Sequence, residues 1–264
     1  MTEKKTERLD TILKDMRSFV VAFSGGVDSS YLAYHAKMLP NLKFIAVTLR
    51  TPFIPKREIN EAIEFAKKHE IDHHIIDLQF PEVIRGNPVD RCYLCKKMLF
   101  DKIIEFAGKN DFNYVADGTN SDDTTSFRPG LKALKELQIR SPLAESGLTK
   151  EDIRTLSRRA DLPLWSKPAM ACLLTRIPFE TEISEGTLKM IEAAEDFLFE
   201  KGYPGTRVRV HSDLARIECL PGFLEKIVND PQKELIISNL KKIGFRYISL
   251  DLEGYKTGSF NPQL

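Results

Sequence analysis

Two hydrophobic periodicities alternate along the first half of the chain. Residues 5–17 carry apolar side chains at helical spacing, whereas residues 18–23 form a short apolar run that ends in Ser-Gly-Gly. The pattern predicts further strands at 43–48, 73–78 and 113–117, and helices at 28–38, 55–70, 92–109 and 127–137. Strands that alternate with helices indicate crossover units and a parallel sheet. We therefore expect a doubly wound α/β domain that binds ligands at the carboxyl ends of its strands.

The pattern changes after Pro178. It predicts a long amphipathic helix at 184–201, two short strands at 207–210 and 215–219, and a helical stretch at 223–243 that Pro231 can interrupt. A last strand, with alternating apolar residues, is predicted at 246–252. This order indicates a small α+β domain. We expect a first domain at residues 1–178 and a second at residues 179–264, which would serve substrate binding or oligomerisation.

Composition and charge narrow the class of protein. Hydrophobic residues make up 42% and charged residues 29%, as in ordinary globular proteins, and the net charge of +1 does not favour nucleic acid as a partner. The chain contains no apolar run of the roughly 20 residues that span a bilayer. Its polar N-terminus lacks the apolar core of a signal peptide, so we expect a cytoplasmic protein without a membrane partner. Its four cysteines then favour metal, redox or nucleophilic chemistry, or core packing, over disulfides.

The segment Ser24-Gly25-Gly26-Val27-Asp28-Ser29-Ser30 lies between a predicted strand and a predicted helix. Glycines let the backbone approach a phosphate, and the N–H groups of the helix start then point at the anion. The serine hydroxyls add donors, whereas a carboxylate at Asp28 implies a bridging Mg²⁺ or a helix cap. The segment lacks the lysine of a Walker-type loop.

This heptapeptide resembles the phosphate loop of the ATP pyrophosphatase (PP-loop) superfamily, an adenine nucleotide alpha hydrolase-like fold. The resemblance implies that ATP is cleaved between its α and β phosphates, with Mg²⁺, and that a substrate oxygen is adenylated. The residues expected to bind the nucleotide are Ser24, Gly25, Gly26, Asp28, Ser29, Ser30, Thr48, Gly118 and Thr119.

Three further segments narrow the choice within this superfamily. They are Asp117-Gly118-Thr119-Asn120-Ser121-Asp122-Asp123 with Arg128-Pro129-Gly130, then residues 140–154, and then Lys167-Pro168-Ala169-Met170-Ala171-Cys172-Leu173-Leu174-Thr175-Arg176-Ile177-Pro178. On chemistry alone, the first segment suits Mg²⁺ or ribose hydroxyls, or merely caps a helix.

Together these segments resemble the ATP-dependent sulfur transferases that mature the nickel-pincer nucleotide cofactor of lactate racemase (LarE-type). The likeness continues to residues 207–218 and covers most of the chain. It implies a small nucleotide substrate, a pyridinium dicarboxylate mononucleotide, whose adenylated carboxylate becomes a thiocarboxylate. It also implies a homo-oligomer and a substrate phosphate held by Arg207 and Arg209, which alternate on a strand and so can face one phosphate.

The cysteines leave two routes for sulfur. Cys172 matches the sulfur-bearing cysteine of the family, which some relatives sacrifice and convert to dehydroalanine. This chain also has Cys92-x-x-Cys95, and three thiolates suit a [4Fe–4S] cluster with one open iron that carries sulfide from another donor. We favour the cluster, and we expect Cys172, Asp28 and Arg176 to act in catalysis, since a basic neighbour favours the thiolate.

Other interpretations stay open from the sequence. Cys-x-x-Cys also suits a dithiol redox pair or half of a zinc site, and all three cysteines can be inert core thiols. A tRNA-thiolating enzyme, a synthetase that uses ammonia and a nucleotide sensor without turnover all share such a loop. The small net charge and the short chain speak against the first two.

Overall fold

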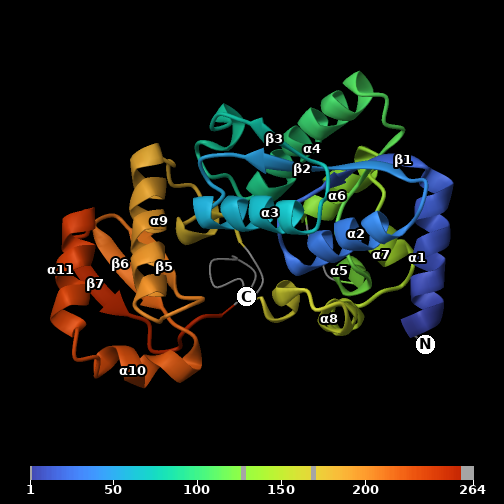
Figure 1. Ribbon diagram of the computed structural model, residues 1–264. Coiled ribbons are helices and arrows are strands. Elements are labelled where there is room, and N and C mark those ends of the chain that lie inside the picture. Colours follow the sequence, from blue (N-terminus) through green and yellow to red (C-terminus); the bar gives the residue numbers. More distant parts are fainter. Residues whose placement is uncertain (1, 126–128, 168–170, 257–264) are drawn as a thin grey trace. The chain divides into compact units, whose positions relative to one another are not determined.

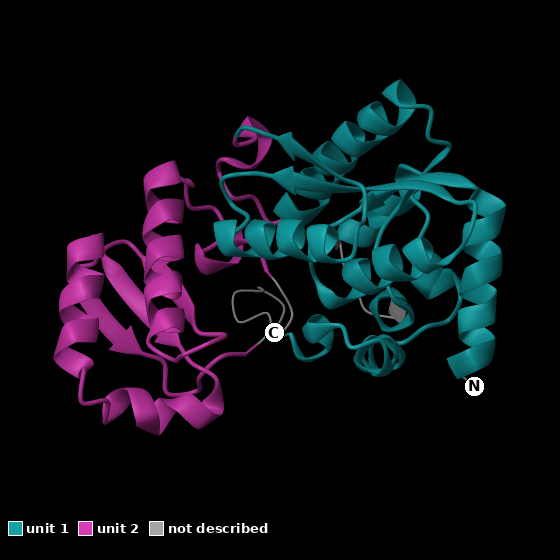
Figure 2. Ribbon diagram, viewed as in Figure 1, with its two compact units in different colours: residues 1–79, 90–170 teal, residues 80–89, 171–264 magenta. Residues whose placement is uncertain are grey.

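The structure of the protein is a computed structural model that describes residues 2–125, 129–167 and 171–256. The chain divides into two compact units, which Figure 2 shows in different colours. Unit 1 comprises residues 1–79 and 90–170, and unit 2 comprises residues 80–89 and 171–264. The structural division thus falls eight residues before the sequence-based one, and it adds a short early segment to unit 2.

A four-stranded parallel sheet forms the centre of unit 1. Its strands are β1 (Ser18–Ala22), β2 (Lys43–Arg50), β3 (His73–Asp77) and β4 (Tyr114–Ala116), in the order β3-β2-β1-β4. The chain moves outward from β1 to β3 and then returns to add β4 on the other side of β1. This reversal is the topological switch point at which open α/β sheets bind ligands. The prediction of a doubly wound parallel sheet is confirmed.

Helices cover both faces of this sheet (Figure 1). They are α1 (Thr2–Met16), α2 (Val27–Met38), α3 (Lys56–Lys68), α4 (Arg91–Lys109), α5 (Ser121–Thr125), α6 (Pro129–Glu136), α7 (Pro142–Glu145) and α8 (Lys150–Arg159), with the 3-10 helix η2 (Pro163–Ser166). A further 3-10 helix, η1 (Glu82–Ile84), belongs to unit 2. No helix within the described ranges is both long and apolar enough to cross a bilayer. The start of the predicted helix 127–137 and the motif residues 168–170 lie outside the described residues.

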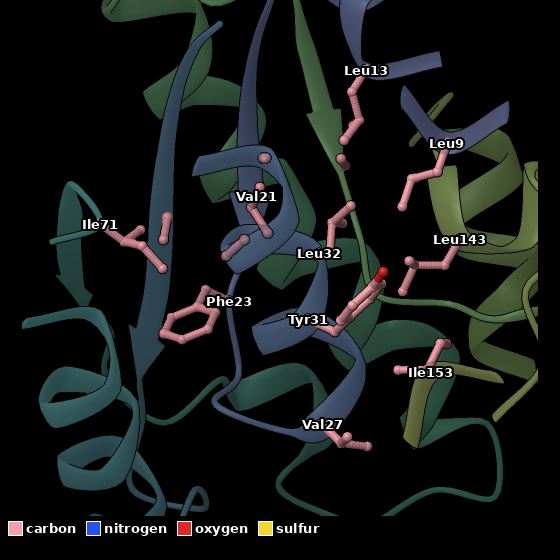
Figure 3. Packing of buried hydrophobic residues seen from close by; sticks show 14 of the residues in the cluster. Leu9, Leu13, Val21, Phe23, Val27, Tyr31, Leu32, Ile71, Leu143 and Ile153 are labelled. Atoms are coloured by element: carbon pink, nitrogen blue, oxygen red, sulfur yellow. The ribbon is translucent and has the colours of Figure 1, made fainter. Parts of the chain in front are cut away.

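Successive side chains of β1 pack on opposite faces of the sheet. Phe19 and Val21 belong to a buried cluster that α1, α2, α3 and α8 complete, part of which Figure 3 shows. Val20, which lies between them, belongs instead to a cluster with α4 and α6. This alternation is the period-two pattern of a strand covered on both faces, and it explains the continuous apolar run in the sequence.

Unit 2 is a small α+β unit, as predicted. Its three-stranded sheet has the order β5 (Arg207–His211), β6 (Leu214–Glu218), β7 (Tyr247–Leu250). The strands β5 and β6 are antiparallel, and β6 and β7 are parallel. The helical stretch predicted at 223–243 is interrupted around Pro231. The elements are η3 (Leu173–Arg176), α9 (Glu185–Glu200), β5 (Arg207–His211), β6 (Leu214–Glu218), η4 (Pro221–Phe223), α10 (Leu224–Val228), α11 (Lys233–Ile243) and β7 (Tyr247–Leu250).

The sheet of unit 2 has one apolar and one charged side. The apolar residues of β5 and β6 are buried hydrophobic side chains, namely Val208, Val210, Ala215 and Ile217. The residues that alternate with them are charged, namely Arg207, Arg209, Arg216 and Glu218, and we call this set the arginine face. Charged side chains are rarely buried unless an oppositely charged group pairs with them. The acidic partners of these arginines therefore determine how their charges are balanced.

A buried asparagine fastens residues 80–89 to the rest of unit 2. Asn87 is fully buried, has a φ of +53°, and donates hydrogen bonds from Nδ2 to the carbonyls of Ile177 (3.1 Å) and Pro178 (2.6 Å). The backbone N–H of Glu180 donates in turn to the carbonyl of Asn87 (2.9 Å). Asparagine tolerates the left-handed backbone and supplies two amide donors, so it suits this position.

Candidate active site

The phosphate loop, residues 24–30, comprises the turn after β1 and the first turn of α2. Gly25 has a φ of +71°, and a Cβ atom there would lie 2.8 Å from the Cβ atom of Ala62 in α3. Both facts require glycine. Gly26 is the N-cap of α2, and no side chain caps this helix start. The N–H groups of the first turn therefore keep no side-chain acceptor, which is the arrangement that binds phosphate in other proteins.

Three serines of the loop differ in their surroundings. The hydroxyls of Ser24 and Ser29 lie 3.2 Å apart, and Ser29 also donates to the carbonyl of Gly26 (3.3 Å). These bonds hold the loop closed across its own turn. Ser30 is only 1% exposed, and its hydroxyl has no hydrogen-bond partner within the described ranges. Ser30 thus lies on the core side of α2, whereas Ser24 and Ser29 lie at its start.

A second loop, which follows β4, packs directly on the start of α2. A Cβ atom on Gly118 would lie 2.8 Å from the backbone nitrogen of Ser29, so only glycine allows this approach. Asp117 accepts hydrogen bonds from Thr119 N (3.2 Å) and Ser141 Oγ (2.7 Å), and the hydroxyl of Thr119 also donates to it. Asn120 caps α5 by accepting from two backbone N–H groups. The helix-capping interpretation of this turn is therefore correct for Asn120.

Asp28 lies in the first turn of α2 and forms an ion pair with Lys150 at the start of α8. Burial raises the pKa of Asp28, Lys150 opposes this rise, and Asp123 adds to it. The Oδ1 atom is buried and accepts no hydrogen bond in the part of the chain that the structure describes. A buried carboxylate oxygen without a donor is costly, so this position fits a cation such as the Mg²⁺ that accompanies ATP.

Thr48 lies behind the phosphate loop rather than at its open side. It is 4% exposed, donates from Oγ1 to the carbonyl of Phe23 (2.7 Å) and lies 2.8 Å from Nε2 of His73. Since the hydroxyl proton is used on Phe23, Nε2 of His73 must donate to the threonine oxygen. Burial lowers the pKa of His73, which is consistent with a neutral ring. Thr48 therefore supports the strand end from which the loop departs.

Lys167 reaches the phosphate loop from a distant segment. Its Nζ atom forms an ion pair with Glu61 of α3 and lies 3.4 Å from the carbonyl oxygen of Gly25. Arg154 of α8 donates to the carbonyl of Lys167 (2.8 Å) and so fixes this segment. Lys150 and Lys167 both lie in motif segments that the sequence analysis singled out, but it did not predict that they lie beside the phosphate loop. No local pattern shows this proximity, because 122 and 142 residues separate them from Asp28 and Gly25.

Cys92 and Cys95 occupy the first turn of α4 in unit 1. Cys92 is exposed and Cys95 is half-buried. Residues three apart share one side of a helix, so the two thiols are neighbours. Cys172, the third predicted cluster ligand, belongs to unit 2. Within the ranges that the structure describes, no three His, Cys, Asp or Glu side chains gather as metal ligands.

The backbone of Cys172 is held by a buried arginine. The carbonyl of Cys172 accepts from Thr175 N (3.1 Å), Thr175 Oγ1 (2.9 Å) and Arg176 Nη1 (2.9 Å). Arg176 is 1% exposed and forms a two-pronged ion pair with Glu195 of α9, with both N–O distances 2.8 Å. Arg176 also donates to the carbonyl of Ala171 (2.8 Å). These contacts make Arg176 a positioning residue for the Cys172 loop.

The arginine face lies against the same loop. Arg209 donates to the carbonyl of Thr175 and, from Nη2, to Oε2 of Glu218 (2.8 Å). Arg207 stacks on the ring of Tyr255, 5.4 Å from its centroid, and its Nη1 atom lies 3.9 Å from Glu195. The sequence predicted that both arginines share one side of a strand, which they do. It did not predict that buried carboxylates hold both of them.

The predicted residues therefore gather in two groups. In unit 1 the structure brings together the serines and glycines of the phosphate loop with Asp28, Gly118 and Thr119. In unit 2 it brings together Cys172, Arg176, Arg207 and Arg209. The first group has the donors that suit the phosphates of a nucleotide, and the second places guanidinium groups next to the loop that carries Cys172.

Comparison with known proteins shows the family to which the chain belongs. A family model described as NAD synthase matches residues 5–88, which include the phosphate loop. An uncharacterised protein of Synechocystis sp. is 36% identical over 267 residues, which covers 100% of this chain and 99% of that protein. A second uncharacterised protein, from Methanocaldococcus jannaschii, is 36% identical over 257 residues, or 96% of this chain and 98% of the relative.

A third relative has a defined activity. The pyridinium-3,5-bisthiocarboxylic acid mononucleotide synthase of Lactiplantibacillus plantarum is 33% identical over 270 residues, which covers 100% of this chain and 95% of that enzyme. This match extends over both units of the chain, including the phosphate loop and the cysteine loop. The chain belongs to the LarE-type family of ATP-dependent sulfurtransferases within the PP-loop ATP pyrophosphatase superfamily.

Proposed function

We propose that the protein converts a carboxylate of a pyridinium dicarboxylate mononucleotide into a thiocarboxylate at the expense of ATP. The main support is the full-length similarity to a synthase whose named product is a bisthiocarboxylic acid mononucleotide. The uncapped start of α2 at the switch point of the sheet supports the ATP-dependent step. Arg209 of the arginine face binds the carbonyl of Thr175, three residues after Cys172, and this supports an anionic substrate near the cysteine loop.

The first half-reaction would take place at the phosphate loop. The substrate carboxylate attacks the α-phosphorus of ATP, the α–β bond breaks, and pyrophosphate leaves with its electron pair. The N–H groups of α2 would bind the phosphates, and Asp28 would hold the Mg²⁺ that accompanies them. Lys150 would then pair with a phosphate instead of with Asp28. The protein contributes position and charge neutralisation here rather than a covalent step.

In the second half-reaction a sulfur nucleophile attacks the acyl carbon of the adenylate and AMP leaves. In the route that we favour, Cys92, Cys95 and Cys172 hold a [4Fe–4S] cluster, which would supply an open iron for a sulfide from an external donor. The neighbouring thiols of α4 fit two of the three ligands. Arg207 and Arg209 would bind the substrate phosphate, and Arg176 would keep the Cys172 loop in place.

The alternative route uses the sulfur of Cys172 itself. Its thiolate attacks the adenylate and releases AMP, which leaves a thioester. Loss of the Cα proton then breaks the Cβ–S bond, so the thiocarboxylate departs and residue 172 becomes dehydroalanine. This route consumes one protein molecule per sulfur, whereas the cluster route permits repeated turnover.

Anaerobic purification followed by iron and sulfide analysis separates the two routes. We expect roughly four iron and four sulfide per chain, with a broad visible absorption band. Cys92→Ala and Cys172→Ala should lose the iron. Cys219→Ala is the matched control, because Cys219 is a fully buried thiol of unit 2 whose sulfur accepts a hydrogen bond from the hydroxyl of Thr206 (3.8 Å). An iron-free protein that turns over once and loses the mass of H₂S at Cys172 would establish the sacrificial route.

A single-turnover assay tests the proposed function itself. The protein is mixed with MgATP and the dicarboxylate mononucleotide, and AMP, pyrophosphate and thiocarboxylate are quantified. AMP and pyrophosphate should appear in equal amounts, and only when the mononucleotide is present. Release that does not depend on the mononucleotide would exclude it as the acceptor. We also propose a homo-oligomer, which light scattering of the full chain can test.

A further inference from the structure

Two arginines face each other directly across the sheet of unit 2. The antiparallel register of β5 and β6 pairs Arg209 with Arg216. Like charges at directly opposite positions destabilise a strand pair, so this arrangement requires compensation. It also means that Arg216 projects from the same side of the sheet as Arg207 and Arg209, because opposite residues share a face. The arginine face therefore carries three guanidinium groups rather than two.

A single buried carboxylate binds both members of this pair. Glu218 is 1% exposed, and its Oε2 and Oε1 atoms accept from Arg209 Nη2 (2.8 Å) and Arg216 Nη2 (3.0 Å). Asp251, which follows β7, approaches Nε of Arg216 at 3.5 Å. These contacts offset the repulsion and hold both guanidinium planes in fixed orientations. A pre-oriented guanidinium loses less rotamer entropy when it binds an anion.

Arg216 differs from the other two arginines in its exposure. Its side chain is 29% exposed, compared with 10% for Arg207 and 5% for Arg209. It lies diagonally from Arg207 on the two strands, and such diagonal positions are about 7–8 Å apart. An anionic molecule with two separated charges can therefore meet Arg207 with one charge and Arg216 with the other.

We propose that Arg216 binds the non-reacting carboxylate of the substrate while Arg207 and Arg209 bind its phosphate, so that Arg216 selects a dicarboxylate over a monocarboxylate. This inference rests on the proposed function. The non-reacting group keeps its negative charge throughout the cycle, both as a carboxylate and as a thiocarboxylate. The reacting carboxylate loses its charge on adenylation, so a strong arginine contact there would oppose the reaction.

Binding of two mononucleotides tests this assignment without any turnover. The probes are the pyridinium 3,5-dicarboxylate mononucleotide and nicotinic acid mononucleotide, which has the same phosphate but one carboxylate. Titration calorimetry gives Kd for each. We expect Arg216→Gln to weaken the dicarboxylate by about 10- to 100-fold, as for a lost hydrogen bond to a charged group. Nicotinic acid mononucleotide should be weakened far less, because Arg209 keeps its own hydrogen bond to Oε2 of Glu218. Arg216→Lys keeps the positive charge but not the two-pronged hydrogen bonding of a guanidinium group. It should weaken binding of the dicarboxylate less than Arg216→Gln does.

The control is Arg246→Gln, the same substitution at an exposed arginine of unit 2, which should change neither Kd. Thermal melts establish that the variants are folded. Equal weakening of both mononucleotides by Arg216→Gln, or no weakening of either, would overturn the assignment of Arg216 and leave the proposed function standing. Wild-type protein that binds neither mononucleotide would overturn the proposed function together with the inference.

Discussion

The contact between Gly118 and the start of α2 allows a quantitative prediction. An alanine Cβ atom at residue 118 would lie 2.8 Å from Ser29 N and 3.1 Å from Ser29 Cα. Ordinary contact begins at 3.4 Å, so the two loops must separate by about 0.6 Å. Both neighbouring atoms belong to the backbone of the phosphate loop, which cannot rotate away as a side chain would. The substitution therefore displaces the N–H groups that would bind ATP.

The expected magnitude follows from this displacement. Overpacking of this kind costs roughly 1–3 kcal/mol of stability, which corresponds to a Tm lower by roughly 2–12 °C in a chain of this size. A catalytic group misplaced by 1 Å can cost about 100-fold in rate, so we expect kcat/KM for MgATP to fall by roughly 10- to 100-fold. The assay is release of pyrophosphate at saturating mononucleotide and variable ATP.

Gly108→Ala is the matched control in the same unit. Gly108 lies near the end of α4, and a Cβ atom there meets nothing within 4 Å. Alanine in a helix is more stable than glycine by roughly 0.5–1 kcal/mol, so this variant should be slightly more stable and fully active. The reasoning is refuted if Gly118→Ala retains the wild-type Tm and the wild-type kcat/KM. A lower Tm with unchanged kcat/KM would show that the contact stabilises the fold without orienting ATP.

Three other substitutions test contacts in both units. Lys150→Met removes the cation that opposes the burial-induced rise in the pKa of Asp28. Its pKa should rise further, so the acid limb of the kcat/KM profile for ATP should move to higher pH; an unmoved limb would mean that this carboxylate need not be ionised. Arg176→Met removes the two-pronged partner of the buried Glu195, which then keeps the N–H of Val208 and the more distant Arg207, and should cost about 3–5 kcal/mol in urea unfolding, whereas a cost below about 1 kcal/mol would contradict the importance of the ion pair. Asn87→Asp removes two amide donors and should cost about 2–5 kcal/mol, while the same change at Asn41, which is exposed with a φ of +62°, should alter stability by less than about 0.5 kcal/mol.

Local sequence patterns predicted the strands and helices of this fold well. Each element buries one or both faces, so its apolar residues recur at the spacing of a strand or of a helix. Phe19, Val20 and Val21 show why: a strand covered on both sides must be apolar at every position, and a short run of this kind stands out. The uncapped glycine-rich turn before α2 was visible for the same reason. Such features depend on neighbours within a few residues.

Features that depend on strand register or on distant partners could not be predicted. The pairing of Arg209 with Arg216 follows from the register of β5 and β6, which the turn between them and the core determine. Lys150 meets Asp28 only after α8 has docked beside α2. The predicted phosphate-binding arginines were correct as a pair on one side of a strand. Their buried acidic partners, Glu195 and Glu218, carry no motif of their own.

The interleaved chain of unit 2 has a consequence during synthesis on the ribosome. Asn87 is made 90 residues before the carbonyl of Ile177 that it binds. At a translation rate of about 5–20 residues per second, this segment waits about 5–18 s for its partner. During that interval Phe80 and Ile84, which are buried in the finished protein, have no completed unit to join. The segment is completed only when Ile183, whose N–H donates to the carbonyl of Arg85 (2.8 Å), has been made, so a split of the gene after residue 170 would leave unit 2 without residues 80–89.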